Sequence, residues 1–280
     1  MNPTLRTMRI SDTSRSLAPL LIFPIRGLLA VLSLLVGISL VSGCGSGGAQ
    51  NTEVLSGRVL SDVQEFDVDG VHVLLRRSVS VPVVSAYLFI RGGSSATPAD
   101  EPISTDQFAM AVATGSGSQH VPKAYYRRRM VRMGSGISGE SGRDYSDLAM
   151  QCVRENFDTT WSYFTDIILH PAFDTVEFDN LKRSVLLSLR SIDLDPESYT
   201  NFELDSIYFS GHPYGRTRTI PDVEALTIPI LRQHFTAQMV TSRLLLSVVG
   251  NVSREELTEK IHATIGQLPR GSYTPMSMPI

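Results

Sequence analysis

The chain has 280 residues, a formal net charge of −3 and 42% hydrophobic residues. This composition is that of a globular protein with one or two domains and enough apolar residues for a sizeable core. Its mildly acidic balance gives no electrostatic basis for binding nucleic acid, so we expect no such partner.

The first 43 residues have the pattern of a secretory signal peptide. Residues 1–26 contain four arginines, and residues 27–43 are uncharged and end in small side chains directly before Cys44. A basic stretch, an apolar stretch and a small-residue cleavage site are typical of a segment that is removed after export. The alternative is a transmembrane anchor that is never removed, for which these 17 uncharged residues are at the short end.

Cys44 is the residue at which we expect cleavage and lipid attachment. The run VSGC at 41–44 resembles the lipobox of bacterial lipoprotein precursors, whose cysteine thiol accepts the lipid. Acylated Cys44 would hold the chain on a lipid bilayer in the bacterial cell envelope, with the body outside the cytoplasm. Residues 44–52 are rich in Gly and Ser and are expected to form a flexible tether. With Cys44 acylated, Cys152 is the only free thiol, so an intrachain disulfide is excluded. Because Cys152 lies in the run LAMQCV at 148–153, we expect it to be a small buried side chain.

The body, residues 53–270, precedes a short C-terminal tail at 271–280 and opens with strand patterns. Apolar residues alternate over 58–68, and Asp69-Gly70 then predicts a hairpin turn. Further strands are expected at 71–77, 81–93, 136–141, 144–153 and 244–250.

Helical patterns fill most of the remaining body. The clearest is 174–192, in which apolar residues recur every three or four positions, and Ser253 is expected to cap the last helix. The predicted helices are 104–115, 122–133, 156–169, 174–192, 196–209, 227–237 and 254–266. Strands followed by helices, and then a returning strand and helix, indicate an α+β fold.

Five segments of the body carry a resemblance to a known family. They are VVSAYLFIRGGS at 83–94, GSGISGESGRDYS at 134–146, IILHPAF at 167–173, HPYG at 212–215 and VVGNV at 248–252. In this order they resemble one domain of the pitrilysin/insulinase family of metallopeptidases, which includes non-catalytic relatives. The resemblance implies an antiparallel sheet backed by helices. It also implies that two such domains, or two such chains, pair as a clamshell.

Peptidases of this family carry the motif His-x-x-Glu-His on their first helix. Residues four apart share one face of a helix, so both imidazoles can bind one zinc ion while the glutamate activates the bound water. Aligned on Gly115, this chain has Asp106, Ala109 and Met110 at the three motif positions. Alanine and methionine neither ligate zinc at useful affinity nor accept a proton from water, so the motif is absent.

The third zinc ligand of the family, a glutamate from a later helix, is also missing. The matching stretch has Ser184, Leu187 and Ser188 instead. No two histidines lie three or four positions apart, and the six are His72, His120, His170, His212, His234 and His262. We therefore expect no catalytic residue, no cofactor, and no place in the folded part where imidazoles and a carboxylate converge on a metal ion.

One feature of the family does not depend on zinc. A substrate peptide adds as a strand to an edge of the sheet through main-chain hydrogen bonds, so a peptide is a candidate partner. By position, Ile137, Ser138 and Gly139 would form that edge strand.

Three other patterns are interpreted as structural. The four arginines in YYRRRMVR at 125–132 indicate a solvated helix face rather than an anion-binding patch. The run GRDYS at 142–146 is interpreted as a turn rather than a hydrolase site. In HPYG at 212–215, proline and glycine are expected to end a helix and tyrosine to pack.

The predicted function is that of a non-catalytic, lipid-anchored peptidase homologue. It would act as the partner or helper of a second pitrilysin-like chain that carries zinc, or as a peptide-binding scaffold. One alternative is a truncated gene product without an independent role, since the chain ends near the point where the first family domain would end. The other is a zinc metalloendopeptidase, against which the missing ligands argue.

Overall fold

The alternating apolar residues at the start of the body form a β-hairpin. In the computed structural model, which describes residues 62–274, β1 (Val63–Val68) pairs with β2 (Val71–Arg77) in antiparallel fashion. Asp69 and Gly70 connect them with positive φ angles of 51° and 86°. Two positive φ angles in a two-residue loop match the twist of the flanking strands, which is why an Asp-Gly pair predicts this turn.

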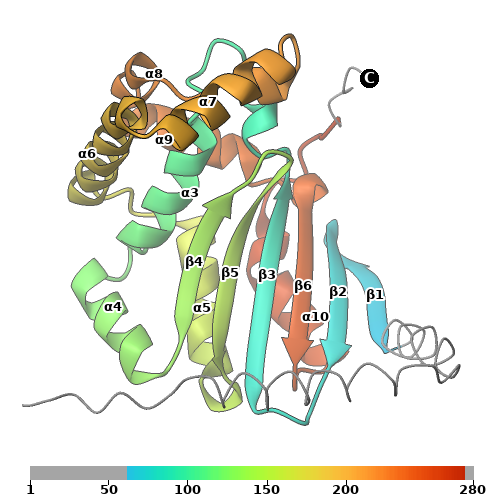
Figure 1. The fold of residues 1–280 in the computed structure, drawn as a ribbon. Helices are drawn as coiled ribbons and strands as arrows, with labels where there is room; N and C mark the ends of the chain where they lie inside the picture. The colour runs from blue at the N-terminus through green and yellow to red at the C-terminus, as the bar shows by residue number, and fades with distance from the viewer. Residues whose placement is uncertain (1–61, 275–280) are drawn as a thin grey trace, which may run out of the picture. The chain divides into compact units, whose positions relative to one another are not determined.

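The sheet contains six strands in the order β1-β2-β6-β3-β5-β4 (Figure 1). The later strands are β3 (Val83–Arg91), β4 (Gly136–Ser141), β5 (Tyr145–Val153) and β6 (Leu244–Gly250). The α+β class is confirmed, with one correction to the expected antiparallel sheet: β2 and β6 run parallel, while the other pairs are antiparallel. The reason is topological, because β6 inserts between β2 and β3, which run in opposite directions, and must be parallel to one of them.

The predicted helices are present with small shifts at their ends. They are α3 (Thr105–Ser116), α4 (Lys123–Arg132), α5 (Phe157–Leu169), α6 (Thr175–Ser191), α7 (Pro196–Tyr208), α9 (Ile228–Gln238) and α10 (Arg254–Ala263). The predicted cap is also present, because Ser253 accepts a hydrogen bond from the N–H of Glu256 (3.1 Å). One helix was not foreseen, α8 (Ile220–Glu224), which is too short to show a periodic pattern.

The core lies between one face of the sheet and the helices behind it. Alternate residues of the central strands are buried on this face, including Leu88, Leu148 and Leu246. α5 and α10 lie behind the sheet in Figure 1. The opposite face carries exposed aromatic side chains, with Tyr87 45% exposed. Cys152 is buried in the core, as its place in an apolar run predicted.

α3 connects the sheet to the other helices. It packs against β4 and β5 on one side and against α6 and α9 on another, and Figure 1 shows it beside the β4 end of the sheet. Within residues 62–274, no helix combines the length and apolar character needed to cross a membrane. The predicted signal peptide at 1–43, Cys44 and the tether at 44–52 lie outside the described residues.

Candidate functional site

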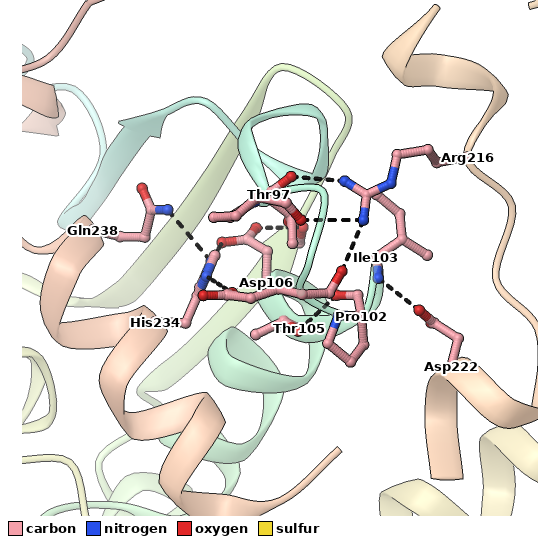
Figure 2. A network of polar contacts seen from close by, with 12 residues as sticks. Thr97, Pro102, Ile103, Thr105, Asp106, Arg216, Asp222, His234 and Gln238 are labelled. Atoms are coloured by element: carbon pink, nitrogen blue, oxygen red, sulfur yellow. Dashed lines mark hydrogen bonds and ion pairs between the residues drawn. The ribbon is translucent and has the colours of Figure 1, made fainter. Parts of the chain in front are cut away.

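The loop that leads into α3 is held in place by two side chains from the region around α8. Asp222 accepts hydrogen bonds from the N–H of Ile103 (2.7 Å) and from the hydroxyl of Ser104 (3.0 Å). Arg216 donates to the carbonyls of Thr97 (2.7 Å) and Glu101 (2.8 Å) (Figure 2). The first turn of α3, which carries Asp106, is therefore positioned by residues more than a hundred positions further along the chain.

Asp106, which the alignment on Gly115 predicts to match the family's first zinc-binding histidine, has a carboxylate enclosed by polar side chains. Oδ1 lies 3.0 Å from Nε2 of His234 on α9, as Figure 2 shows. Oδ2 accepts hydrogen bonds from Ser141 (2.6 Å) at the end of β4 and from Ser146 at the start of β5. The side chain is only 2% exposed. A carboxylate whose two oxygens are already engaged has little capacity left for a metal ion.

His234 lies between two carboxylates. Its Nδ1 is 3.1 Å from Oε2 of Glu101, opposite the contact to Asp106, and the histidine is 2% exposed. Each ring nitrogen thus has a carboxylate oxygen within hydrogen-bonding distance, and Nε2 also lies 3.4 Å from Nε2 of Gln238. Buried charges are stable when they are paired and hydrogen-bonded, and this network meets that condition.

The pKa of Asp106 follows from the same contacts. Burial raises it, but the hydrogen bonds from His234, Ser141 and Ser146, with the charge of His234, outweigh burial and hold the pKa below its usual value. Asp106 is therefore an ionised structural residue and not a proton acceptor tuned near neutrality.

The other positions of the zinc motif offer no ligands. Ala109 and Met110 are fully buried and belong to the core cluster. Ser184, Leu187 and Ser188, which match the helix of the third ligand, lie on the exposed side of α6. The assignment of these residues to the zinc-motif positions stays a prediction from the sequence, which did not foresee the partners of Asp106. No local pattern could have shown them, because His234 is 128 positions away.

β4, which contains the predicted edge residues, has β5 as its only strand neighbour within the described chain. Gly142 donates its N–H to the carbonyl of Tyr145 (2.9 Å), which makes these two residues a hydrogen-bonded pair. Such pairs recur at every second residue of an antiparallel ladder. Ser138 is therefore bonded to β5, whereas Ile137 and Gly139 direct their N–H and C=O groups towards the open edge.

A groove of about 480 Å³ lies beside this edge. Its walls come from β4, from the C-terminal end of α3 and from α4, and they include Ile137, Ser138, Gly139, Thr114, Tyr126 and Met130. The groove thus combines unpaired backbone groups with apolar and small side chains, which is the chemistry of a site for an extended segment.

The HPYG turn and the GRDYS hairpin pack against each other. The hydroxyl of Tyr214 donates to Asp144 (2.5 Å), and this hydrogen bond raises the pKa of the phenol. Arg143 pairs with Asp205 (2.6 Å) and lies over the rings of Phe209 and Tyr214. These contacts support the structural interpretation of both motifs.

The arginine run on α4 divides its side chains between water and acidic partners. Arg127 contacts Glu177 at 3.4 Å, while Tyr126 and Met130 of the same helix are buried. This arrangement agrees with a solvated helix face.

Two histidines contradict the expectation that no imidazoles and carboxylate converge in the folded part. His120, Asp166 and His170 come together at the surface, with one potential ligand atom from each within 4.8 Å of the others. The expectation that imidazoles and a carboxylate nowhere converge is therefore wrong. Asp166 and His170 lie four positions apart at the end of α5, on the same face of the helix, and this spacing could have indicated a ligand pair. It was missed because only pairs of histidines were sought.

Comparison with known proteins agrees with this architecture. No protein-family model matches the chain. The sequence is 21% identical over 149 residues to the mitochondrial-processing peptidase subunit beta of Dictyostelium discoideum, a match that covers 52% of this chain and 32% of that protein.

Solved structures with a similar fold cover a larger share of the chain. A peptidase M16 inactive domain from Pseudomonas fluorescens superposes with a TM-score of 0.69 at 17% identity, over 75% of this chain and 52% of that one. The periplasmic protease PqqL from Escherichia coli gives 0.64 at 15% identity, over 75% of this chain and 24% of that one. A protease from Helicobacter pylori gives 0.65 at 15% identity, over 78% and 54%.

The fold and the site together define the class of protein. The chain has the fold of a peptidase M16 domain, and the resemblance to the pitrilysin/insulinase family is confirmed at the level of the fold. The chain spans about a third of the curated relative and between a quarter and just over half of these solved chains.

Proposed function

We propose that this chain is a non-catalytic homologue of the M16 peptidases that binds an extended polypeptide segment at the β4 edge. The observation that carries the proposal is the contrast between the two halves of the site. At the zinc-motif positions Asp106 is enclosed by His234 and two serines, and Ala109 and Met110 are core residues. At the edge of the sheet, no strand of residues 62–274 covers the outer side of β4, and the groove lies beside it.

Backbone pairing supplies affinity that does not depend on zinc. A segment added beside β4 would exchange hydrogen bonds with Ile137 and Gly139, the residues whose N–H and C=O groups face outward. Side chains of that segment would enter the groove between α3 and α4. An extended peptide, or a strand of a partner protein, satisfies both requirements.

The test is binding of a fluorescein-labelled synthetic peptide derived from casein, followed by fluorescence anisotropy. Ile137→Pro removes an outward-facing N–H and should abolish binding, since proline cannot donate to a ladder. Ile137→Ala is the matched control, because it also shortens the half-buried side chain but keeps the N–H. Equal binding by the two variants would reject the proposal.

A second measurement covers the case in which Ile137→Pro does not fold. The same peptide with alternate backbone nitrogens methylated should not bind the unaltered chain, because a methylated nitrogen cannot donate a hydrogen bond. If the methylated peptide binds as tightly as the parent peptide, edge pairing is not the mode of binding.

The proposal that the chain is non-catalytic is tested by a peptide-cleavage assay. Incubated with the labelled peptide, the purified chain should give no cleavage products with or without added zinc ions. Cleavage that a chelator stops, in a preparation free of contaminating proteases, would instead support a zinc metalloendopeptidase.

We further propose that the chain is lipid-anchored at Cys44 in the bacterial cell envelope and pairs with a second M16-type chain that carries zinc. The lipobox-like run before Cys44 and the periplasmic description of a similar structure support this placement. Mass spectrometry of the membrane-extracted chain should show a diacylated N-terminal cysteine, which Cys44→Ser removes. Co-purification from the same membranes should recover a chain with His-x-x-Glu-His, and recovery of the chain alone would count against pairing.

A further inference from the structure

His120, Asp166 and His170 meet where the loop between α3 and α4 passes the C-terminal end of α5. Nδ1 of His120 lies 2.7 Å from Oδ1 of Asp166. The rings of the two histidines have centroids 4.6 Å apart and are inclined by 72°. Within residues 62–274, these three side chains are the group whose potential ligand atoms lie close enough together, within 4.8 Å of one another, to share one ion.

The backbone holds the two segments of this cluster together. Gln119 donates its N–H to the carbonyl of His170 (2.8 Å), and Ala172 donates to the carbonyl of Gly117 (3.1 Å). Ser118 and Pro171 form an isolated antiparallel bridge between these bonds. His120 and His170 are therefore fixed at their Cα atoms, and only side-chain rotation remains to be ordered when a ligand binds.

The cluster is open to solvent and chemically suited to a metal ion. The side chain of His120 is 62% exposed and that of Asp166 is 19% exposed. Two neutral imidazoles and one carboxylate suit Zn²⁺, which forms bonds of about 2.0–2.2 Å to such ligands. Ligand atoms on one tetrahedral ion then lie about 3.3–3.5 Å apart, and those of the three side chains already lie within 4.8 Å of one another.

We propose that His120, Asp166 and His170 bind a divalent transition-metal ion, with Zn²⁺ as the best match. Three protein ligands leave at least one coordination position for water or for a side chain of a partner, as in zinc sites that are not purely structural. The ion would link the loop before α4 to the end of α5. This site does not depend on the proposed peptide binding, and the two can fail separately.

A plain surface ion pair is the competing explanation of the cluster, and the chain contains such a pair for comparison. His262 lies 2.7 Å from Asp69, the same separation as His120 and Asp166, and its side chain is 77% exposed. No second histidine joins that pair among the described residues. His262→Ala is therefore the matched control for His120→Ala and His170→Ala.

The test is competition for Zn²⁺ between the full chain, purified in detergent, and a chromogenic zinc chelator. We expect one ion bound per chain at micromolar zinc. His120→Ala and His170→Ala should each weaken binding by more than about tenfold, since loss of even an indirect supporting residue costs 10–100-fold. His262→Ala should leave the affinity unchanged. Absence of binding, or full binding by the double variant His120→Ala/His170→Ala, would overturn the proposal.

Cobalt substitution separates this site from binding at the cysteines. Co²⁺ bound to nitrogen and oxygen ligands should give visible absorption without the near-ultraviolet charge-transfer band of a thiolate, whereas that band would place the metal on Cys152, the thiol that remains free when Cys44 is acylated. Zinc should also raise the melting temperature of the unaltered chain but not of the double variant, because an ion that binds the native state stabilises it. An equal shift in both would assign the ion to another site.

Discussion

Nε2 of His234 lies 3.0 Å from Oδ1 of Asp106, a contact that joins α9 to α3 across 128 positions of the sequence. It places a buried Asp–His contact at the position that the alignment on Gly115 predicts for the family's first zinc ligand. Here this contact joins two packed helices. The carboxylate of Asp106 is hydrogen-bonded within the protein, so we expect its replacement to lower the free energy of unfolding.

Asp106→Ala should lower the free energy of unfolding by about 3–5 kcal/mol, because it leaves His234 buried without one of its partners. Urea denaturation followed by circular dichroism measures this loss. Asp205→Ala is the control, since Asp205 forms an exposed pair with Arg143 that should contribute at most about 1 kcal/mol. If the two variants lose the same amount, the Asp106 network is not a major source of stability.

The stability contributed by Asp106 should disappear in acid. Its pKa is lower in the folded chain than in the unfolded chain, where it is about 3.9. Its contribution is therefore fully present above the unfolded pKa and is lost as the pH falls through the folded pKa. The difference in unfolding free energy between the unaltered chain and Asp106→Asn should shrink as the pH is lowered from about 5 to about 3. A difference that stays constant would contradict the lowered pKa.

Gly139→Ala should destabilise the chain by about 1–3 kcal/mol through overpacking. A Cβ atom at Gly139 would lie 2.8 Å from Cγ2 of Thr114 and 2.9 Å from Cδ2 of Leu148. Gly136→Ala, on the same strand, would meet no atom within 4 Å and should be close to neutral. Thermal unfolding of the two variants measures the contrast. Equal melting temperatures would show that α3 does not pack against β4 as closely as described.

The thiol of Cys152 should be unreactive in the native chain. Burial raises its pKa, more than the hydrogen bond to Thr160 and the charge of Arg154 lower it, and the residue is 1% exposed. In a Cys44→Ser background, a disulfide reagent such as DTNB should titrate no thiol in buffer and one in concentrated guanidinium chloride. Rapid reaction in buffer would show that the core around β5 opens easily.

Most elements of the fold could be predicted from the sequence because their signals are local. The Asp69-Gly70 pair indicated the first hairpin, and the helix boundaries followed from apolar spacing and caps such as Ser253. The five-residue α8 was not predicted because it is too short for apolar residues to recur over two turns of a helix. The insertion of β6 between β2 and β3 was also not predicted, since no local pattern encodes which strands become neighbours.

By itself, the amino-acid sequence determined that the chain contains no His-x-x-Glu-His motif, because a motif is a matter of residue identity. Ala109 and Met110, which the alignment on Gly115 places at two of its positions, cannot replace glutamate and histidine. Only the tertiary structure decided what Asp106 does instead, and that His120 meets Asp166 and His170. The contact of Asp106 with His234 joins residues 128 positions apart, and that of His120 with Asp166 joins residues 46 positions apart. Their existence depends on how helices and loops pack on the sheet, and that packing reflects the free energy of the whole core and not any single segment.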